Sequence, residues 1–404
     1  MVPRLRRTEY VFFYCQDGDS LDIPLLLRGQ AVLAPVRQIL ALSILTGEAH
    51  AISRGDLDVL VSMPAKTWVD AAELEGGEST VAELARKGLV VSDDPDSLLR
   101  ELRRRDELLS ATEWNVYSAL YHFMTKWRDV DLEKAPDEDP TASGELDSRA
   151  AEDWIALHGE PPAHFHSVAD DASAVTPLPL VTREGALYEI LLRRKTTRAF
   201  AAETPMTCDD FSVLLRYAFG CQGYAGLGDG LVLLKKTSPS GSGLHPSEVY
   251  ALVANVDGIE PGLYHYGVER HVLEPIERLS REEVGELAYE FTSGQPYARS
   301  AHCLFVLTTR FYRNFWKHPR HERSYAVLLM DAAHLSQTFY LVCADLGLGA
   351  FVTAAINGAN IEEQLGLDGV GEGALAVCGC GVPAGVASRL EPDFLPYVPG
   401  ETVL

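Results

Sequence analysis

The chain has 404 residues, of which 47% are hydrophobic and 23% are charged, a composition typical of globular proteins with more than one core. Its formal net charge of −23 argues against a nucleic-acid partner, because phosphate binding requires a basic surface. A cationic peptide would be a more compatible partner, although surplus acid can also serve only to keep a protein in solution.

The apolar runs are strand-sized, and none approaches the ~18–20 residues needed to cross a bilayer, so we expect no membrane span. The N-terminal residues lack a signal-peptide pattern. The seven cysteines are scattered and mostly lie in apolar segments, which is typical of buried thiols in a reducing compartment. These features predict a cytoplasmic protein.

Residues 1–110 are predicted to form a small α+β module. It opens with two strands and a helix, at Glu9–Cys15, Leu21–Leu27 and Arg37–Leu45. Two more helices and a short strand follow, and the resulting order of helix, helix, helix and wing is that of a winged-helix module.

Capping signals define these two later helices. Ser53 can cap the first of them, and the capping-box pattern Thr80–Glu83 predicts the start of the second. Gly88 stands where a left-handed residue would end that helix, and Leu89–Val91 follows as a strand.

Residues 111–180 are expected to connect this module to the rest of the chain. Five aromatic residues between Thr112 and Arg128 predict a helix that packs against another element. The stretch Asp129–Asp147 is acidic and contains two prolines, which indicates a linker.

Residues 181–404 are predicted to form the main α+β domain. Apolar periodicity predicts helices at Leu187–Arg193, Thr207–Phe219, Arg281–Phe291 and Glu322–Leu346. Strands are predicted at Leu231–Lys236, Val249–Val256, Cys303–Thr309 and Ala374–Cys380.

A cluster of cations follows the first of these helices and is a candidate phosphate site. It reads Arg194-Lys195-Thr196-Thr197-Arg198. Three cations and two hydroxyls within five residues can bind a phosphomonoester by charge-assisted hydrogen bonds. A solvated basic helix end is the alternative when the cluster is taken alone.

A second motif, Ser238 to Tyr250, supplies a Ser/Gly loop that leads into a strand. Together the two motifs resemble the FMN-binding nitroreductase superfamily, whose phosphate clamp reads R-R-S-x-R-x-F and whose flavin loop reads P-S-G-G-x-L-H-P-x-E-V-Y. Three further segments are similar to the SagB-type dehydrogenases of azole-containing peptide biosynthesis: Gly262–Tyr266, Asp331–Gln337 and Leu346–Ala350. The resemblance covers about residues 185–385.

The resemblance implies a three-layer sandwich with a central mixed sheet, an FMN cofactor and a homodimer. It implies that the FMN phosphate and ribityl chain bind Arg194, Lys195, Thr196 and Arg198, and that Pro239, Ser240 and Gly241 line the ring. It places the backbone of Ala354 and Ala355 at the flavin N5 and O4 atoms. Arg389 is a candidate late phosphate contact, with a surface arginine as the alternative.

The resemblance also suggests the catalytic residues. Azoline-oxidising members carry a Lys-Tyr pair before the long helix, where this chain has Lys317 and His318. Oxidising an azoline to its azole requires a base to take a carbon-bound proton while a hydride leaves to the flavin. Lysine can be this base if its surroundings lower its pKa, and histidine can share the transfer. The missing tyrosine puts azole formation in doubt but not flavin binding.

Two other functions therefore stay open: NAD(P)H-dependent reduction of dehydroamino acids in a peptide, and a non-catalytic scaffold subunit of a peptide-modifying complex. The expected partners are a precursor peptide and a cyclodehydratase or another peptide-modifying enzyme. The module 1–110 resembles units that recognise leader peptides, with a docking domain as the alternative.

Three other features are read as structural. His164 and His166 lack the carboxylate or cysteine partners of a metal site, so no metal is expected. Cys378 and Cys380 are expected to be buried strand thiols. Gln295 occupies a position similar to one in the family, without an assigned role.

Overall fold

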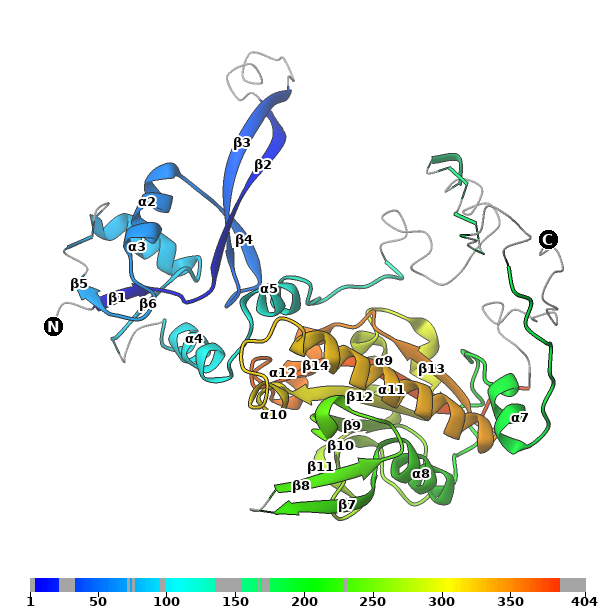
Figure 1. The fold of residues 1–404 in the computed structure, drawn as a ribbon. Coiled ribbons are helices and arrows are strands. Elements are labelled where there is room, and N and C mark those ends of the chain that lie inside the picture. The colour runs from blue at the N-terminus through cyan, green and yellow to red at the C-terminus, as the bar shows by residue number, and fades with distance from the viewer. Residues whose placement is uncertain are drawn as a thin grey trace. The chain divides into compact units, whose positions relative to one another are not determined.

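The computed structural model describes residues 4–21, 33–70, 73–74, 77–94, 99–134, 155–157, 159–160, 162–163, 165, 168, 175–228 and 231–385. The chain forms two compact units, each built from several segments (Figure 1). Unit 1 comprises Met1–Trp127, Thr309–Leu328 and Glu362–Gly373. Unit 2 comprises Arg128–Thr308, Leu329–Ile361 and Ala374–Leu404.

Unit 1 contains two three-stranded sheets. The first has the order β5-β1-β6, made of Val69–Asp70, Arg4–Arg7 and Val90–Ser92. The second has the order β2-β3-β4, made of Val11–Leu21, Leu33–Ser43 and Glu48–Ile52. Its helices are α2 (Arg54–Ser62), α3 (Gly77–Arg86), α4 (Arg100–Ala111), α5 (Val116–Met124) and α10 (Phe311–Phe315).

Several predictions for this unit are confirmed. Ser53 caps α2 and forms a capping box with Asp56, Gly88 is left-handed with φ 64°, and a strand follows. The helix predicted at Arg37–Leu45 is wrong, because residues 33–43 pair along their whole length with β2. The capping box at Thr80 is also wrong, because α3 begins at Gly77, so Thr80 lies inside the helix. Of the predicted strand Leu21–Leu27, only Leu21 lies within the described residues.

The aromatic segment 112–128 contributes to the core of unit 1. Trp114 is fully buried and packs against Phe311 and Phe315, with ring centroids 4.4 and 5.0 Å away. Its indole nitrogen donates to the carbonyl oxygen of Val370 at 3.0 Å. The predicted connecting helix is α5, and its residue His122 accepts or donates at Nδ1 to the hydroxyl of Tyr325 at 2.9 Å.

Unit 2 is built around a six-stranded sheet with the order β11-β10-β9-β12-β14-β13. These strands are Val272–Arg278, Gly262–Gly267, Ser247–Val253, Cys303–Arg310, Glu372–Gly381 and Gly349–Thr353. A separate hairpin is formed by β7 (Cys221–Gly228) and β8 (Leu231–Lys236). The main helices are α7 (Ala186–Arg193), α8 (Cys208–Leu214) with the π-helical continuation η3 (Leu215–Phe219), α9 (Arg281–Phe291), α11 (Ser324–Asp345) and α12 (Gly358–Leu365).

Both faces of the large sheet are buried at its central strand, β12. Phe305 and Leu307 of β12 pack in one core cluster with α8 and α11, whereas Leu304 and Val306 point to the opposite face and are equally buried. Cys378 and Cys380 belong to the first cluster, as expected. The sheet is thus the middle layer of the predicted three-layer α+β fold (Figure 1).

The long apolar helix α11 is a core element. Among the described residues it is the one helix that could cross a bilayer by length and composition. Phe339 and Cys343 on this helix are nevertheless fully buried among the strands of unit 2. Packing therefore explains the apolar residues on one face of the helix, whereas Leu329 and Met330 are exposed.

Candidate functional site

The cationic segment lies directly after α7 and is fixed to the sheet. The backbone nitrogen of Thr197 donates to the carbonyl oxygen of Ala350 on β13 at 2.7 Å. A Cβ atom at Gly349 would come within 2.6 Å of the Thr197 side chain, so only glycine allows this close approach. The position of the segment is therefore set by the edge strand of the sheet.

Two tyrosines support the arginine and threonine side chains of this segment. The guanidinium of Arg194 lies 5.3 Å from the ring centre of Tyr340, and the Tyr340 hydroxyl lies 3.0 Å from Oγ1 of Thr196. The guanidinium of Arg198 lies 5.4 Å from the ring centre of Tyr297. Cation–π contacts of this kind orient a guanidinium while leaving donors along its edge.

A pocket of about 200 Å³ adjoins the segment. Its walls include Arg193, Lys195, Thr197, Tyr340 and residues 347–350, which are the turn before β13 and the first two residues of that strand. Ligand pockets typically measure ~300–1,000 Å³, so this one suits a phosphate group better than a whole flavin. The cationic side chains Arg193 and Lys195 and the backbone of the glycine-containing turn are groups that can bind such an anion.

The Ser/Gly loop is held by a buried carboxylate for which the sequence predicted no role. Asp331 on α11 is 3% exposed; its Oδ2 accepts the hydroxyl of Ser240 at 2.6 Å and its Oδ1 accepts the amide of Gly241 at 2.9 Å. Oγ of Ser240 in turn accepts the amide of His245 at 3.0 Å. Pro239 beside them is exposed. Asp331 therefore determines the shape of the loop, and its motif gave no sign of this role.

Ala354 and Ala355 follow β13 and are linked to the cationic segment through side chains. Nε2 of Gln295 donates to Oγ1 of Thr353 at 3.1 Å and to the carbonyl oxygen of Ala355 at 3.3 Å. The hydroxyl of Tyr297, which contacts Arg198, donates to Oε1 of Gln295. Gln295 thus has a role that the sequence left open.

Two groups of this network, the hydroxyl of Tyr297 and the amide of Ala355, have defined hydrogen-bond roles. Burial raises the pKa of Tyr297, so its hydroxyl stays a hydrogen-bond donor at neutral pH. The amide of Ala355 donates to Oγ1 of Thr353 at 3.1 Å and is therefore committed within the protein. Ala354 is exposed at the end of the strand.

The two candidate catalytic residues belong to unit 1, whereas the candidate flavin residues belong to unit 2. Lys317 is exposed and His318 is half-buried, and the backbone nitrogens of both donate to the carbonyl oxygen of Asn314. The ring of His318 lies 6.3 Å from that of His321, edge to face. The carbonyl oxygen of His318 accepts the hydroxyl of Ser324 at 3.2 Å.

Some predicted residues lie outside the described part of the chain, namely Arg389, His164 and His166. Within the described part, no group of three or more histidine, cysteine or acidic side chains is arranged to hold a metal ion. All seven cysteines are described, and all are free thiols.

Comparison with known proteins identifies the domain that carries these motifs. Residues 191–382 match the model of the nitroreductase family. A Methanocaldococcus jannaschii protein named as a nitroreductase is 28% identical over 179 residues, which is 44% of this chain and 83% of that protein. The trifolitoxin-processing protein TfxB of Rhizobium leguminosarum bv. trifolii is 35% identical over 146 residues. That match covers 35% of this chain but only 38% of TfxB.

Among solved structures, the chain is similar to one from the E. coli microcin synthetase McbBCD complex with truncated pro-MccB17 bound. The identity is 19% and the TM-score 0.47, over 71% of this chain and 98% of that one.

Proposed function

Because residues 191–382 are a nitroreductase-family domain, we propose that this chain is an FMN-dependent oxidoreductase that matures a ribosomally made peptide. The observation that carries the proposal is the fixed cationic segment beside the pocket of about 200 Å³. The relation to TfxB, a protein named for processing trifolitoxin, supports a peptide as substrate. The seven free thiols support our proposal that the protein works in a reducing compartment such as the cytoplasm.

The charge of the cationic segment and the size of its pocket suit the phosphate end of the cofactor. In our proposal Arg194, Lys195, Thr196 and Arg198 bind the phosphate and ribityl chain, as the exposed Lys195 at the pocket and the supported guanidiniums suggest. Pro239, Ser240 and Gly241 would line the ring, with Asp331 holding their loop. Ala354 and Ala355 would supply backbone contacts to the ring, with Ala354 the better donor because the Ala355 amide is already bonded. We also propose that Arg389 contacts the phosphate.

The reaction that we propose is oxidation of an azoline ring to an azole. Bound FMN would supply the two-electron acceptor for the hydride. Lys317 or His318 would accept the proton from the ring carbon. Both side chains are bases, and they stand where the azoline-oxidising members carry their Lys-Tyr pair. The segment's backbone bonds to Asn314 and Ser324 would keep these bases in one place.

We further propose three parts for the chain: a peptide-recognition module at 1–110, a connection at 111–180 and the flavin domain at 181–404. The module would bind the leader of the precursor peptide, and a cyclodehydratase or another peptide-modifying enzyme would supply the ring that is oxidised. Holding the leader raises the local concentration of the core peptide at the flavin.

A second copy of the chain is the partner that we propose for α7. Leu187, Leu191 and Leu192 on this helix are exposed, and none of the eight residues of α7 is buried. A helix with this much apolar surface gains stability when another surface covers it. Light scattering should give twice the mass of the chain, and a monomer would contradict the homodimer.

The absorbance spectrum of the purified protein tests the cofactor. We expect flavin bands that are released on denaturation as FMN. A colourless protein that does not take up FMN would contradict the proposal and favour the non-catalytic scaffold.

The direction of electron flow is tested by anaerobic mixing with NADPH. The histidine that replaces the family tyrosine favours the alternative, in which NAD(P)H supplies electrons to reduce a dehydroamino acid. Rapid bleaching by NADPH would support that reductase. Bleaching only by an azoline-containing peptide would support the oxidation.

A further inference from the structure

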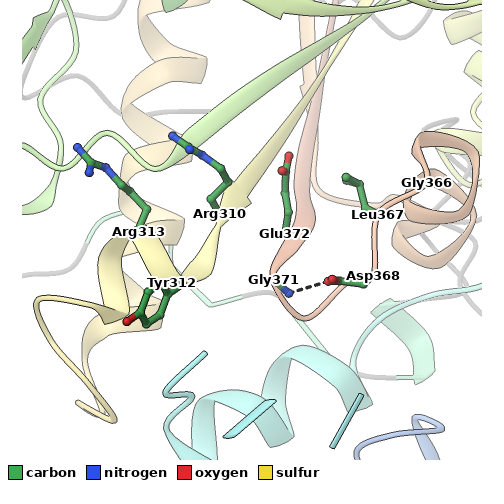
Figure 2. A pocket seen from close by; sticks show the side chains of 8 residues that line it. All are labelled: Arg310, Tyr312, Arg313, Gly366, Leu367, Asp368, Gly371 and Glu372. Atoms are coloured by element: carbon green, nitrogen blue, oxygen red, sulfur yellow. Dashed lines mark hydrogen bonds between the residues drawn. The ribbon is translucent and has the colours of Figure 1, made fainter. Parts of the chain in front are cut away.

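A pocket of about 520 Å³ lies within unit 1, and none of its lining residues belongs to the candidate flavin site. The volume falls in the range of ~300–1,000 Å³ that is typical of small-ligand sites. Figure 2 shows the lining residues, which are Arg310, Tyr312, Arg313, Gly366, Leu367, Asp368, Gly371 and Glu372.

Hydrogen bonds hold the two walls of this pocket together. The amide of Phe311 donates to the carbonyl oxygen of Gly371 at 2.9 Å, which joins the segment of the arginines to the turn before β14. The same turn is fixed by Trp114, whose indole donates to Val370 at 3.0 Å. Phe311 and Trp114 are fully buried, so closely packed side chains position both walls. The pocket is therefore formed without a ligand.

The acidic residue of the turn serves the protein itself. Oδ1 of Asp368 accepts the amides of Val370 at 2.8 Å and of Gly371 at 2.6 Å. Figure 2 shows its carboxylate directed at Gly371. Two backbone donors satisfy this carboxylate, so Asp368 shapes the wall and is not expected to bind a ligand.

Three other charged side chains remain to face a ligand. Arg310, Arg313 and Glu372 extend to the same side of the turn in Figure 2. Each already interacts with a neighbour in the protein. A guanidinium has five N–H donors, so one partner leaves others for a ligand. With Asp368 counted as well, the two arginines and two carboxylates of the lining sum to zero. The Asp368 carboxylate is directed at the backbone of the turn, however, so the side of the pocket that carries the two arginines has only Glu372 as its acid. This local excess of one positive charge matches a monoanion better than a doubly charged phosphate.

We propose that this pocket binds a carboxylate of the peptide substrate. Arg310 and Arg313 would donate to the carboxylate, and Glu372 would accept the N–H of the adjacent amide. Leu367 offers an apolar wall for the remainder of the residue. That the carboxylate belongs to a substrate peptide rests on the proposed function, whereas the charge recognition itself does not.

The test uses the full-length protein and N-acetyl-glycylglycine as the probe, with its C-terminal amide as the matched neutral compound. Saturation-transfer NMR detects the weak binding expected of such a fragment, with a Kd on the order of 1 mM. We expect binding of the acid and at least tenfold weaker binding of the amide. Arg310→Gln and Arg313→Gln should each weaken binding of the acid about tenfold, whereas Arg310→Lys should lose less because it keeps the charge.

Arg323→Gln is the control variant, since Arg323 is an exposed arginine of the same segment that does not line the pocket. Equal binding of acid and amide, or no effect of either pocket variant, would overturn the proposal. Tighter binding of inorganic phosphate than of every carboxylate would overturn it as well. Two further compounds decide whether a side-chain carboxylate binds as well as a C-terminal one. N-acetyl-aspartate α-amide keeps the side-chain acid, and N-acetyl-aspartic acid diamide, in which an amide replaces that acid, is its neutral control.

These measurements do not involve the flavin. Loss of carboxylate binding would therefore leave the flavin proposal intact, and a flavin-free protein could still bind the probe.

Discussion

Glu113 and Arg320, 207 residues apart in the chain, both have left-handed backbone conformations and bind each other twice. Their φ angles are 60° and 53°. The amide of Arg320 donates to the carbonyl oxygen of Glu113 at 3.0 Å, and its Nε donates to the Glu113 carboxylate at 2.7 Å. Left-handed residues other than glycine are strained and persist where their surroundings hold them. In this protein, the hydrogen bonds between Glu113 and Arg320 hold the segment that contains Lys317 and His318.

Replacing Arg320 with Asn should loosen this segment. Asn tolerates the left-handed backbone and keeps the amide bond to Glu113, so the substitution removes only side-chain ion pairs, the close one with Glu113 and a longer one with Glu9 at 3.5 Å. Because the two side chains are 44% and 38% exposed, we expect a stability loss of no more than about 1 kcal/mol. Amide hydrogen exchange of residues 316–323 should become faster. Arg323→Asn is the control, and unchanged exchange in R320N would show that the pair does not hold the segment.

Removing the carboxylate of Asp331 should weaken flavin binding. Asp331→Ala leaves the half-buried hydroxyl of Ser240 and amide of Gly241 without their acceptor, at a cost of about 1–3 kcal/mol. We expect a lower midpoint of thermal unfolding and at least tenfold weaker FMN binding. Asp331→Asn should recover part of both because it keeps one acceptor oxygen. Asp345→Ala, at the exposed end of the same helix, is the control.

If D331A unfolds earlier but binds FMN as tightly as the wild type, the Ser/Gly loop does not contact the flavin. Flavin fluorescence quenching measures the affinity in each variant.

The cationic segment should discriminate FMN from riboflavin. A charge-assisted hydrogen bond contributes about 1.5–3 kcal/mol, so Lys195→Gln and Arg198→Gln should each weaken FMN binding by at least tenfold. Riboflavin has no phosphate, and its weaker binding should change little in either variant. Arg270→Gln is the control, since Arg270 is an exposed arginine paired with Glu274. Equal losses for FMN and riboflavin would place the phosphate elsewhere.

His265 should make the stability of the protein depend on pH. Hydrogen bonding to Glu248, and then to Glu274, raises its pKa from 6.5 to about 8 despite partial burial. Glu248 has the larger effect although its contact is longer, 3.4 against 2.9 Å, because it is less exposed than Glu274. The charged imidazole thus stabilises the folded state, and its contribution is complete below about pH 6.5 and is lost as the pH rises through about 8.

Urea unfolding of the wild type and of His265→Gln at several pH values measures this contribution. The difference in unfolding free energy should be about 1–2 kcal/mol at pH 6 and should disappear by about pH 9. A difference that does not vary with pH would contradict the assignment.

The helices and strands of unit 2 could be predicted because their signals are local. The prediction Arg281–Phe291 agrees with α9 residue for residue, and the helix predicted from Thr207 begins at Cys208, with Thr207 as its N-cap. Periodicity and capping depend only on neighbouring residues. In the N-terminal module, residues 37–45 fail this test because the long pairing with β2 outweighs their local helical pattern.

The residue types of the site could be predicted, but the long-range hydrogen bonds that position them could not. Asp331 holds Ser240 across 91 positions, and Gln295 reaches Ala355 across 60. Such contacts depend on the order of the strands in the sheet, which no local pattern encodes. The pairing of Glu113 with Arg320 is of the same kind. Roles for Lys317, His318 and the flavin ligands remain predictions.

Trp114 has a consequence for how the protein is made. Its indole bonds to Val370, which the ribosome adds 256 residues later, and its aromatic neighbours Phe311 and Phe315 are also late. The core around Trp114 therefore cannot close until most of the chain has been synthesised. A fragment cut before residue 309 would expose this tryptophan to water and should aggregate, so excising the N-terminal module requires a replacement for these late segments.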